Sequence, residues 1–358
     1  MSSKQAIAII IMFLFGSSVV MGVNSELGQD VWIAIGVSIA LFIPFALIYA
    51  RIIKIFPGKD IYDVSEELFG RIFGKIIIIL ITWYAIHLGA LVLRNFSEFI
   101  QIATLTETPQ LIIMITMLLV VIYLAKSGVE VLGRWSIIIF VIVIAVVIFT
   151  VLASIGNMSF DNLLPISEHQ IGDVLTSGYH IFSFPFAETI LFMTIASSIR
   201  KKDSPYKIYL YAILIAGIIF MIIIMRNITV LGVPMSQASY FPSYTTTRLI
   251  SISDFLTRIE GSITINFILA GITKITVCLI AASKGISKLF SIKNYNSIIV
   301  SVALIILALC TILYDNIQQM FEFLPVYSIY AVPFQIIIPL ILWIGAERSL
   351  KKKKKIIH

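Results

Sequence analysis

One stretch of the chain combines a proline and a carboxylate within an apolar run long enough to cross a membrane. Residues 182–188 read Phe-Ser-Phe-Pro-Phe-Ala-Glu, so that Glu188 follows Pro185 by three positions. Because proline lacks an N–H and clashes with the preceding turn, a helix here must kink or open. A carboxylate at mid-membrane costs about 2.5–3.5 kcal/mol on insertion scales. Glu188 is therefore expected to handle a proton, to pair with a cation, or to cap the half-helix that follows Pro185.

A second interruption lies in the first apolar run, where Phe15 is followed by Gly16, Ser17 and Ser18. Glycine and two serines are poor helix continuers, and an unwound stretch would free backbone groups to bind a ligand. The half-helix after it would direct a positive dipole end at an anion such as a carboxylate. The structural alternative is close helix packing, because small residues are common where membrane helices touch.

Three more polar side chains lie within apolar runs. Lys274 is too deep in its run to reach either surface easily, so it is expected to occupy a cation site between the first and eighth runs or to pair with Glu188. The alternative is a lysine nearer the cytoplasmic boundary. Tyr84 and His87 could line the same cavity, although a packed aromatic and a hydrogen-bonded histidine are the commoner roles for such residues.

The sequence carries no pattern typical of catalysis. The four histidines show no metal-ligand spacing, and Cys278 and Cys310 both lie in apolar runs as small core residues. There is no phosphate loop, no dinucleotide fingerprint and no convincing nucleophile motif. We therefore expect no catalytic residue, no metal, no cofactor and no enzymatic activity.

Composition identifies the elements that must position these residues. Hydrophobic residues make up 59% of the 358 residues and charged residues 13%, and the mean hydropathy is +1.03. In a typical soluble protein, hydrophobic residues make up about 45–50% and charged residues about 25%. A chain of this composition is expected to have the lipid bilayer as its surroundings. The net charge of +7 does not indicate nucleic acid, because the basic residues lie mainly in short gaps between apolar runs.

A spanning helix needs about 20 apolar residues. By this criterion we predict an all-α integral membrane protein with a single domain over residues 1–358. Its ten transmembrane helices are expected at about residues 6–23, 31–50, 76–93, 110–125, 135–155, 175–198, 208–225, 262–282, 297–314 and 326–346. The two interruptions fall in the first and sixth helices. Breaks at matching positions of two five-helix halves are typical of an inverted-repeat transporter fold.

Charge in alternate loops predicts the orientation. Of the 26 Lys and Arg residues, 21 fall on one side of the ten predicted helices, including those of a basic tail at residues 347–358. The positive-inside rule then places both termini in the cytoplasm. Two loops carry apolar residues at helical spacing. Residues 60–73 are expected to form an amphipathic helix on the cytoplasmic surface, and residues 245–260 one over the outer face.

These motifs together resemble the spore germination permease family. The resemblance extends over nearly the whole chain, and its most specific part is the stretch at residues 182–188. It rests also on the Gly-Ser-Ser sequence at 16–18, Pro-Gly at 57–58, Leu-Arg-Asn-Phe at 93–96 and Arg-Ile-Glu at 258–260. The family belongs to the amino acid–polyamine–organocation superfamily, so the resemblance implies the five-plus-five inverted repeat, LeuT-like, with discontinuous helices 1 and 6.

The resemblance further implies the B subunit of a spore germinant receptor, in the cell membrane or the spore inner membrane. Such a subunit binds a small nutrient, typically an amino acid, and works with A and C subunits. By analogy, the ligand carboxylate meets the backbone at residues 16–18, and its ammonium meets carbonyls near Phe184, Pro185 and Phe186. Ala187 departs from the family, which often has glycine there. The residues alone leave open a proton- or cation-coupled amino acid permease and a scaffold without a ligand.

Overall fold

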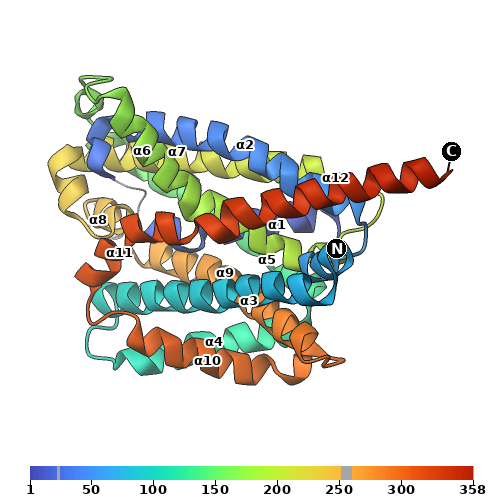
Figure 1. The fold of residues 1–358 in the computed structure, drawn as a ribbon. Coiled ribbons are helices and arrows are strands. Elements are labelled where there is room, and N and C mark those ends of the chain that lie inside the picture. The colour runs from blue at the N-terminus through green and yellow to red at the C-terminus, as the bar shows by residue number, and fades with distance from the viewer. Residues whose placement is uncertain (22–24, 251–259, 358) are drawn as a thin grey trace.

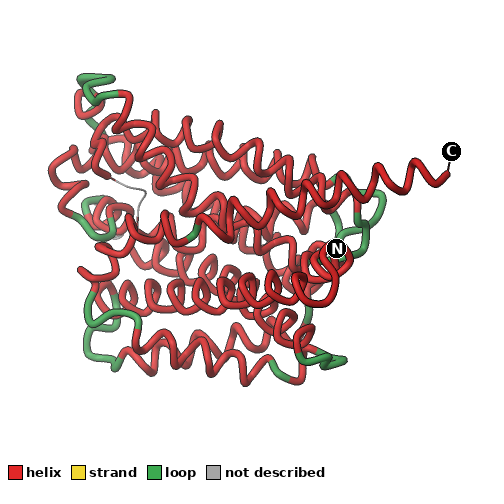
Figure 2. The backbone as a smooth tube through the Cα atoms, viewed as in Figure 1, coloured by secondary structure: helices red, strands yellow, loops and turns green. Residues whose placement is uncertain are grey.

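The protein is a bundle of long helices. The structure, a computed structural model, describes residues 1–21, 25–250 and 260–357, and this part of the chain contains helices and loops but no strand (Figure 2). The helices lie side by side with their connections at the two ends of the bundle (Figure 1). The N-terminus lies near the end of the bundle from which the last helix projects, so both termini share that end (Figure 1).

The first half of the chain contains five long helices. They are α1 (Ser3–Met21), α2 (Val31–Ile55), α3 (Ile61–Ala103), α4 (Gln110–Ser127) and α5 (Val129–Ser154). Short turns of helix accompany them at η1 (Ser25–Asp30), η2 (Ile155–Asn157) and η3 (Phe160–Leu163).

The second half is more interrupted. Its sixth span is built from α6 (Ile171–Ile181), η4 (Phe182–Phe186), η5 (Ala187–Thr194) and η6 (Ala196–Ser198). Then follow α7 (Pro205–Ala238), α8 (Pro242–Arg248), α9 (Glu260–Leu289), η7 (Tyr295–Ser297) and α10 (Ile299–Ile312). The last span consists of α11 (Ile317–Tyr330), η8 (Pro333–Ile337) and α12 (Ile338–Ile357).

Length and hydropathy indicate an integral membrane protein. Seven of the described helices are long and apolar enough to cross a bilayer, and two shorter apolar helices cover Ser3–Ser18 and Ile299–Ile312. The sixth span is absent from both sets because it is divided into short pieces at Phe184 and Pro185. These counts are consistent with the ten predicted helices. Large apolar side chains such as Ile115, Leu119 and Ile138 face outward, where lipid would cover them.

The two predicted interruptions have different outcomes. In the sixth span the helix opens at Phe184, whose backbone is extended (φ −130°, ψ 109°) just before Pro185. The first span does not open at residues 15–18, because α1 remains α-helical from Ser3 to Met21. The Ser18 hydroxyl donates to the Leu14 carbonyl at 2.5 Å, which keeps its polar group within the helix. The expected unwound stretch at Gly16 is therefore corrected to a continuous helix.

Residues 60–73 form the N-cap and first part of α3, and the start of this helix has local causes. The Asp60 side chain accepts from the backbone N–H groups of Tyr62 and Asp63, and the Asp63 carboxylate accepts from the Asp60 N–H. Gly70, at φ 72°, then turns the chain into the long apolar part of α3. The second amphipathic helix, expected at 245–260, is described only as far as α8, and residues 251–259 lie outside the described part.

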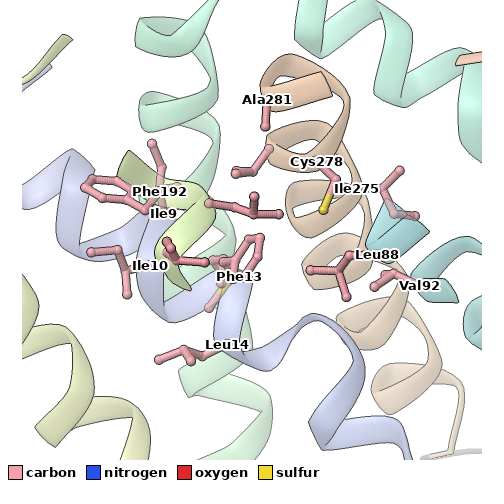
Figure 3. Packing of buried hydrophobic residues seen from close by; sticks show 14 of the residues in the cluster. Ile9, Ile10, Phe13, Leu14, Leu88, Val92, Phe192, Ile275, Cys278 and Ala281 are labelled. Atoms are coloured by element: carbon pink, nitrogen blue, oxygen red, sulfur yellow. The ribbon is translucent and has the colours of Figure 1, made fainter. Parts of the chain in front are cut away.

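The α9 helix lies at the centre of the bundle. Its Ile275, Cys278 and Ala281 pack with Ile9, Ile10, Phe13 and Leu14 of α1, Leu88 and Val92 of α3, and Phe192 of η5 (Figure 3). All ten side chains are buried. Because every residue of α9 from Ala270 to Ser283 is buried, a polar group in this stretch must find its partner within the bundle.

Candidate functional site

Lys274 and Glu188 form an ion pair in the middle of this apolar core. The Lys274 Nζ lies 2.5 Å from Glu188 Oε2, and both side chains are 0% exposed. Glu188 comes from η5, directly after the break at Pro185, and Lys274 comes from α9. Of the roles considered for Lys274, pairing with Glu188 is the one that the structure shows. Two charges buried together in an apolar core neutralise each other, whereas either alone would be costly.

The small residues of α1 make room for the lysine. A Cβ added at Gly16 would lie 2.5 Å from Lys274 Cδ and 2.6 Å from its Cβ, so only glycine fits against this side chain. The next residue, Ser17, accepts a hydrogen bond from Lys274 Nζ at 3.0 Å. The rings of Phe13 and Phe184 lie 5.2 Å from the same ammonium, within cation–π range. The Gly-Ser-Ser sequence thus serves close packing and the solvation of a buried charge.

A chain of hydrogen bonds leads to the other oxygen of Glu188. The Tyr327 hydroxyl donates to Glu188 Oε1 at 2.6 Å. Because the hydrogen of the Tyr327 hydroxyl is used in that bond, its oxygen accepts a hydrogen bond from the Tyr84 hydroxyl at 2.8 Å. Tyr84 in turn accepts from Gln335 Nε2 at 2.8 Å. Every donor in this chain points toward the carboxylate. We call Ser17, Tyr84, Glu188, Lys274, Tyr327 and Gln335 the polar centre.

Gln335 connects two interrupted spans. Its amide nitrogen donates to the Ser183 carbonyl at 2.9 Å, and its amide oxygen accepts from the Ser183 hydroxyl at 3.1 Å. Tyr49 of α2 donates to the Gln335 backbone carbonyl at 2.9 Å. The carbonyls released where η4 and η8 leave regular helix geometry are thereby satisfied. The irregular backbone is tolerated because it is buried in protein.

A small cavity adjoins the polar centre. It measures about 20 Å³ and is lined by Ser17, Leu88, Leu91, Val92, Asn95, Phe184, Glu188, Tyr314, Met320, Phe323, Leu324 and Tyr327. One water needs at least about 10–15 Å³ by the same measure, so this volume holds about one. An amino acid would require the surrounding helices to separate. The conformation described is closed around the ion pair.

The remaining residues predicted for the site lie elsewhere. His87 stacks on Trp83 at 5.7 Å, and its Nδ1 has no hydrogen-bond partner within the described residues. Phe15 packs on Phe220 at 5.0 Å, and Phe186 packs on Phe220 at 6.0 Å. These three residues make no hydrogen bond or ion pair with the polar centre in the described structure. Phe184 does reach it, through its ring, and Pro185 shapes the break next to it.

Sequence reasoning missed three members of the network: Tyr327, Gln335 and Ser183. One signal for Gln335 was present, because it follows Pro333 by two positions in the last apolar span. That arrangement parallels Pro185 and Glu188 in the sixth span. A polar residue just after an intramembrane proline marks the place where a helix opens and a polar interior begins. Ser183 lies within the apolar stretch that was singled out, but its side chain was given no role.

Comparison with known proteins identifies both family and fold. A family model described as "Spore germination protein" matches residues 1–320. Spore germination protein KB of Bacillus subtilis (strain 168) is 29% identical over 361 residues, covering 99% of this chain and 96% of that protein. The putative spore germination protein YfkT of the same organism is 25% identical over 316 residues, covering 88% and 87%.

Two solved transporter structures have the same fold. Mhp1, a nucleobase-cation-symport-1 family transporter solved in a closed conformation with bromovinylhydantoin bound, gives a TM-score of 0.66 at 12% identity, covering 95% of this chain and 77% of that one. MhsT in complex with L-phenylalanine gives a TM-score of 0.65 at 13% identity, covering 94% of this chain and 87% of that one. At such low identity the likeness shows the fold alone. It confirms the expected LeuT-like, all-α membrane fold.

Proposed function

The chain belongs to the spore germination protein family, and from this premise we propose that it is the B subunit of a germinant receptor. In this role it binds a small nutrient, an amino acid, between α1 and the interrupted sixth span. Binding then signals germination together with A and C subunits. We place it in the spore inner membrane with both termini on the core side, in keeping with the excess of Lys and Arg on that side.

The buried Glu188–Lys274 pair is the observation that supports a ligand site here. An amino acid carries one ammonium and one carboxylate, the same two groups that the pair already holds together. A ligand entering the adjoining cavity can therefore exchange partners, its ammonium with Glu188 and its carboxylate with Lys274 and Ser17. Charges buried in a membrane bundle commonly mark such sites. The fold neighbour MhsT, solved in complex with L-phenylalanine, supports a ligand of this class.

Closure of the cavity supports a signalling role for α1. Since the cavity holds about one water, ligand entry requires α1 and the sixth span to separate. Gly16 of α1 packs against the Lys274 side chain so closely that no Cβ fits between them. In the closed state the backbone at residues 16–18 is engaged in α1, so contact between the ligand carboxylate and this backbone would require α1 to open.

A germination assay tests the proposal with a matched pair of variants. Spores lacking the gene would be complemented with wild type, Gly16→Leu or Gly36→Leu, and optical density would be followed across amino acids, sugars and nucleosides. Gly36 lies on α2 with no atom within 4 Å of an added Cβ, so its variant controls for added bulk. We expect wild type and Gly36→Leu to restore the response to one nutrient, and Gly16→Leu to lose it with unchanged protein level. A full response of Gly16→Leu would remove α1 from the site.

A proton- or cation-coupled amino acid permease is the second candidate, favoured by the transporter fold and by the Glu188–Lys274 pair itself. Proteoliposomes with radiolabelled amino acid would separate the two functions. Accumulation driven by a pH gradient, and abolished by Glu188→Gln, would make the protein a transporter. Ligand-dependent thermal stabilisation without accumulation would favour the receptor.

A further inference from the structure

A buried arginine outside the polar centre carries a charge that no acidic residue balances. Arg226 of α7 is 3% exposed. No Asp or Glu in the described residues lies within the 4.0 Å that defines an ion pair with it. An unpaired charge of this kind is strongly unfavourable inside an apolar bundle. By contrast, the two other buried Lys and Arg side chains among the described residues, Arg94 and Lys274, pair with Glu98 and Glu188.

The hydrogen bonds of Arg226 use only part of its capacity. Its Nη1 donates to Thr150 Oγ1 at 2.8 Å, and its Nε and Nη2 donate to Asn227 Oδ1 at 3.2 and 2.7 Å. A guanidinium has five N–H donors, so two of them have no acceptor in the described residues. All the acceptors it does have are neutral. The positive charge of Arg226 and two of its N–H groups are therefore available to a bound ligand.

A small cavity adjoins the Arg226 side chain. It measures about 20 Å³ and contains the polar side chains Arg226, Thr150, Ser243 and Asn266 among apolar ones. The Ser243 hydroxyl accepts from Asn227 Nδ2 at 3.0 Å, and its own hydrogen has no described acceptor. Asn266 Oδ1 is buried and has no hydrogen-bond partner within the described residues. A half-turn of that amide would present its NH₂ group to the same space.

We propose that this cavity, the arginine cavity, binds one small monatomic anion of the size of chloride. The volume admits a single particle slightly larger than water and excludes an amino acid. The free donors of Arg226 and Ser243 are the groups that solvate an anion, and its charge would balance the guanidinium. A water molecule would satisfy the donors but leave the positive charge unbalanced.

The bound anion would join four helices at one point. Arg226 lies on α7, Thr150 on α5, Ser243 on α8 and Asn266 on α9. Phe15 of α1 forms part of the wall, directly before the Gly16 that packs on Lys274. Occupancy would therefore hold α7 and α8 in place beside α1. This inference is independent of which nutrient binds, and also of whether the protein senses or transports it.

Thermal unfolding of the purified full-length protein tests the site. Unfolding would be followed at constant ionic strength while potassium chloride replaces potassium gluconate, whose anion is too large for the cavity. A ligand that binds only the folded state raises the unfolding midpoint with its concentration. We expect chloride to stabilise wild type, Arg226→Gln to abolish this dependence, and Arg248→Gln, which alters an exposed arginine of α8, to keep it. Equal midpoints for wild type in both salts would overturn the proposal.

A milder variant keeps the test decisive if Arg226→Gln does not fold. Ser243→Ala removes one hydroxyl donor and leaves the arginine. A hydrogen bond to a charged group contributes enough to binding that the chloride concentration for half-maximal stabilisation should rise about tenfold or more. An unchanged concentration would exclude Ser243, and with it this cavity, as the site. Equal stabilisation by formate would overturn the assignment to a monatomic ion.

Discussion

Burial of Glu188 and Lys274 costs hydration free energy, and the packing of the core does not require two charged residues at these positions. Both side chains are 0% exposed, and each loses its hydration on folding. Replacement of such a pair by apolar residues of similar volume is often neutral or stabilising. Glu188 also accepts one hydrogen bond from Tyr327, and Lys274 donates one to Ser17, so both hydrogen bonds support a charge-separated arrangement. This argues for a functional reason to retain it.

A double-mutant cycle distinguishes the pair's structural role from its functional one. Lys274→Met should destabilise the protein by about 3–5 kcal/mol, because it leaves Glu188 buried without a counter-charge. Adding Glu188→Gln should recover most of that loss, since no uncompensated charge then remains. Germination or uptake should be lost in both. Chemical unfolding in detergent measures the first effect, and spore assays measure the second. Recovery of activity in the double variant would make the pair merely structural.

Asp60, at the start of α3, offers a pH test outside the membrane-spanning part. Burial raises its pKa above the ordinary 3.8, and Lys284, with Nζ at 3.4 Å from Oδ2, opposes that rise. A carboxyl whose folded-state pKa is raised favours folding most strongly below 3.8 and loses that contribution as the pH rises through the folded-state pKa. Ionised Asp60 at neutral pH is therefore a net cost of burial.

The reference for this test is Asp60→Asn, because asparagine still caps the helix but does not titrate. The stability of wild type minus that of Asp60→Asn should fall as the pH rises from about 4, by at most about 1.4 kcal/mol per pH unit, and then level off. Unfolding midpoints from about pH 4 to about pH 8 give the curve. A difference that grows with pH would mean that Lys284 outweighs burial.

At the scale of elements, the two interrupted spans form one unit. The break in the sixth span at Phe184 and the irregular turn η8 in the last span meet through Gln335 and Ser183. Pro185 made the break in the sixth span predictable from the sequence, because proline lacks a backbone N–H in any context. Gly16 and the serines beside it only weaken a helix. Packing against Lys274 decided their conformation, which could not be known from the local sequence.

Gln335→Leu tests the connection between these spans. The change keeps a similar volume but leaves the Ser183 carbonyl and the Tyr84 hydroxyl without their donor. We expect a loss of about 1–3 kcal/mol for the buried groups left unsatisfied. Unfolding in detergent measures it, and Gln318→Leu, at an exposed position of α11, serves as the control. Equal stability of the two variants would show that the irregular turns hold their geometry without Gln335.

At the scale of the whole molecule, most of the fold could be predicted from the composition of its segments. Apolar runs predicted the membrane class, and charge in alternate loops predicted an orientation, because both are properties of single segments. The polar centre was only partly predictable. Glu188 and Lys274 stood out as charges in apolar runs, whereas Tyr327 is one aromatic among many. Its partnership with Glu188 joins residues 139 positions apart, and one sequence does not contain that pairing.

The orientation of the molecule remains a prediction, and two structural facts make it testable with thiol labelling. The natural cysteines, Cys278 and Cys310, are both 0% exposed, so they should give little background. The N-terminal amine donates to the Ser198 carbonyl at 2.7 Å. A reporter at the neighbouring exposed Lys201 therefore reads the side on which the N-terminus lies.

Lys201→Cys and Thr106→Cys form the matched pair, since both positions are exposed and the two loops are predicted to lie on opposite sides. A membrane-impermeant maleimide should label Thr106→Cys in intact cells, and Lys201→Cys only after permeabilisation. The reason is that loops rich in Lys and Arg stay on the cytoplasmic side, and the loop at Lys201 carries four of them at 200–202 and 207. The reverse pattern would place both termini on the outer side and overturn the proposed orientation.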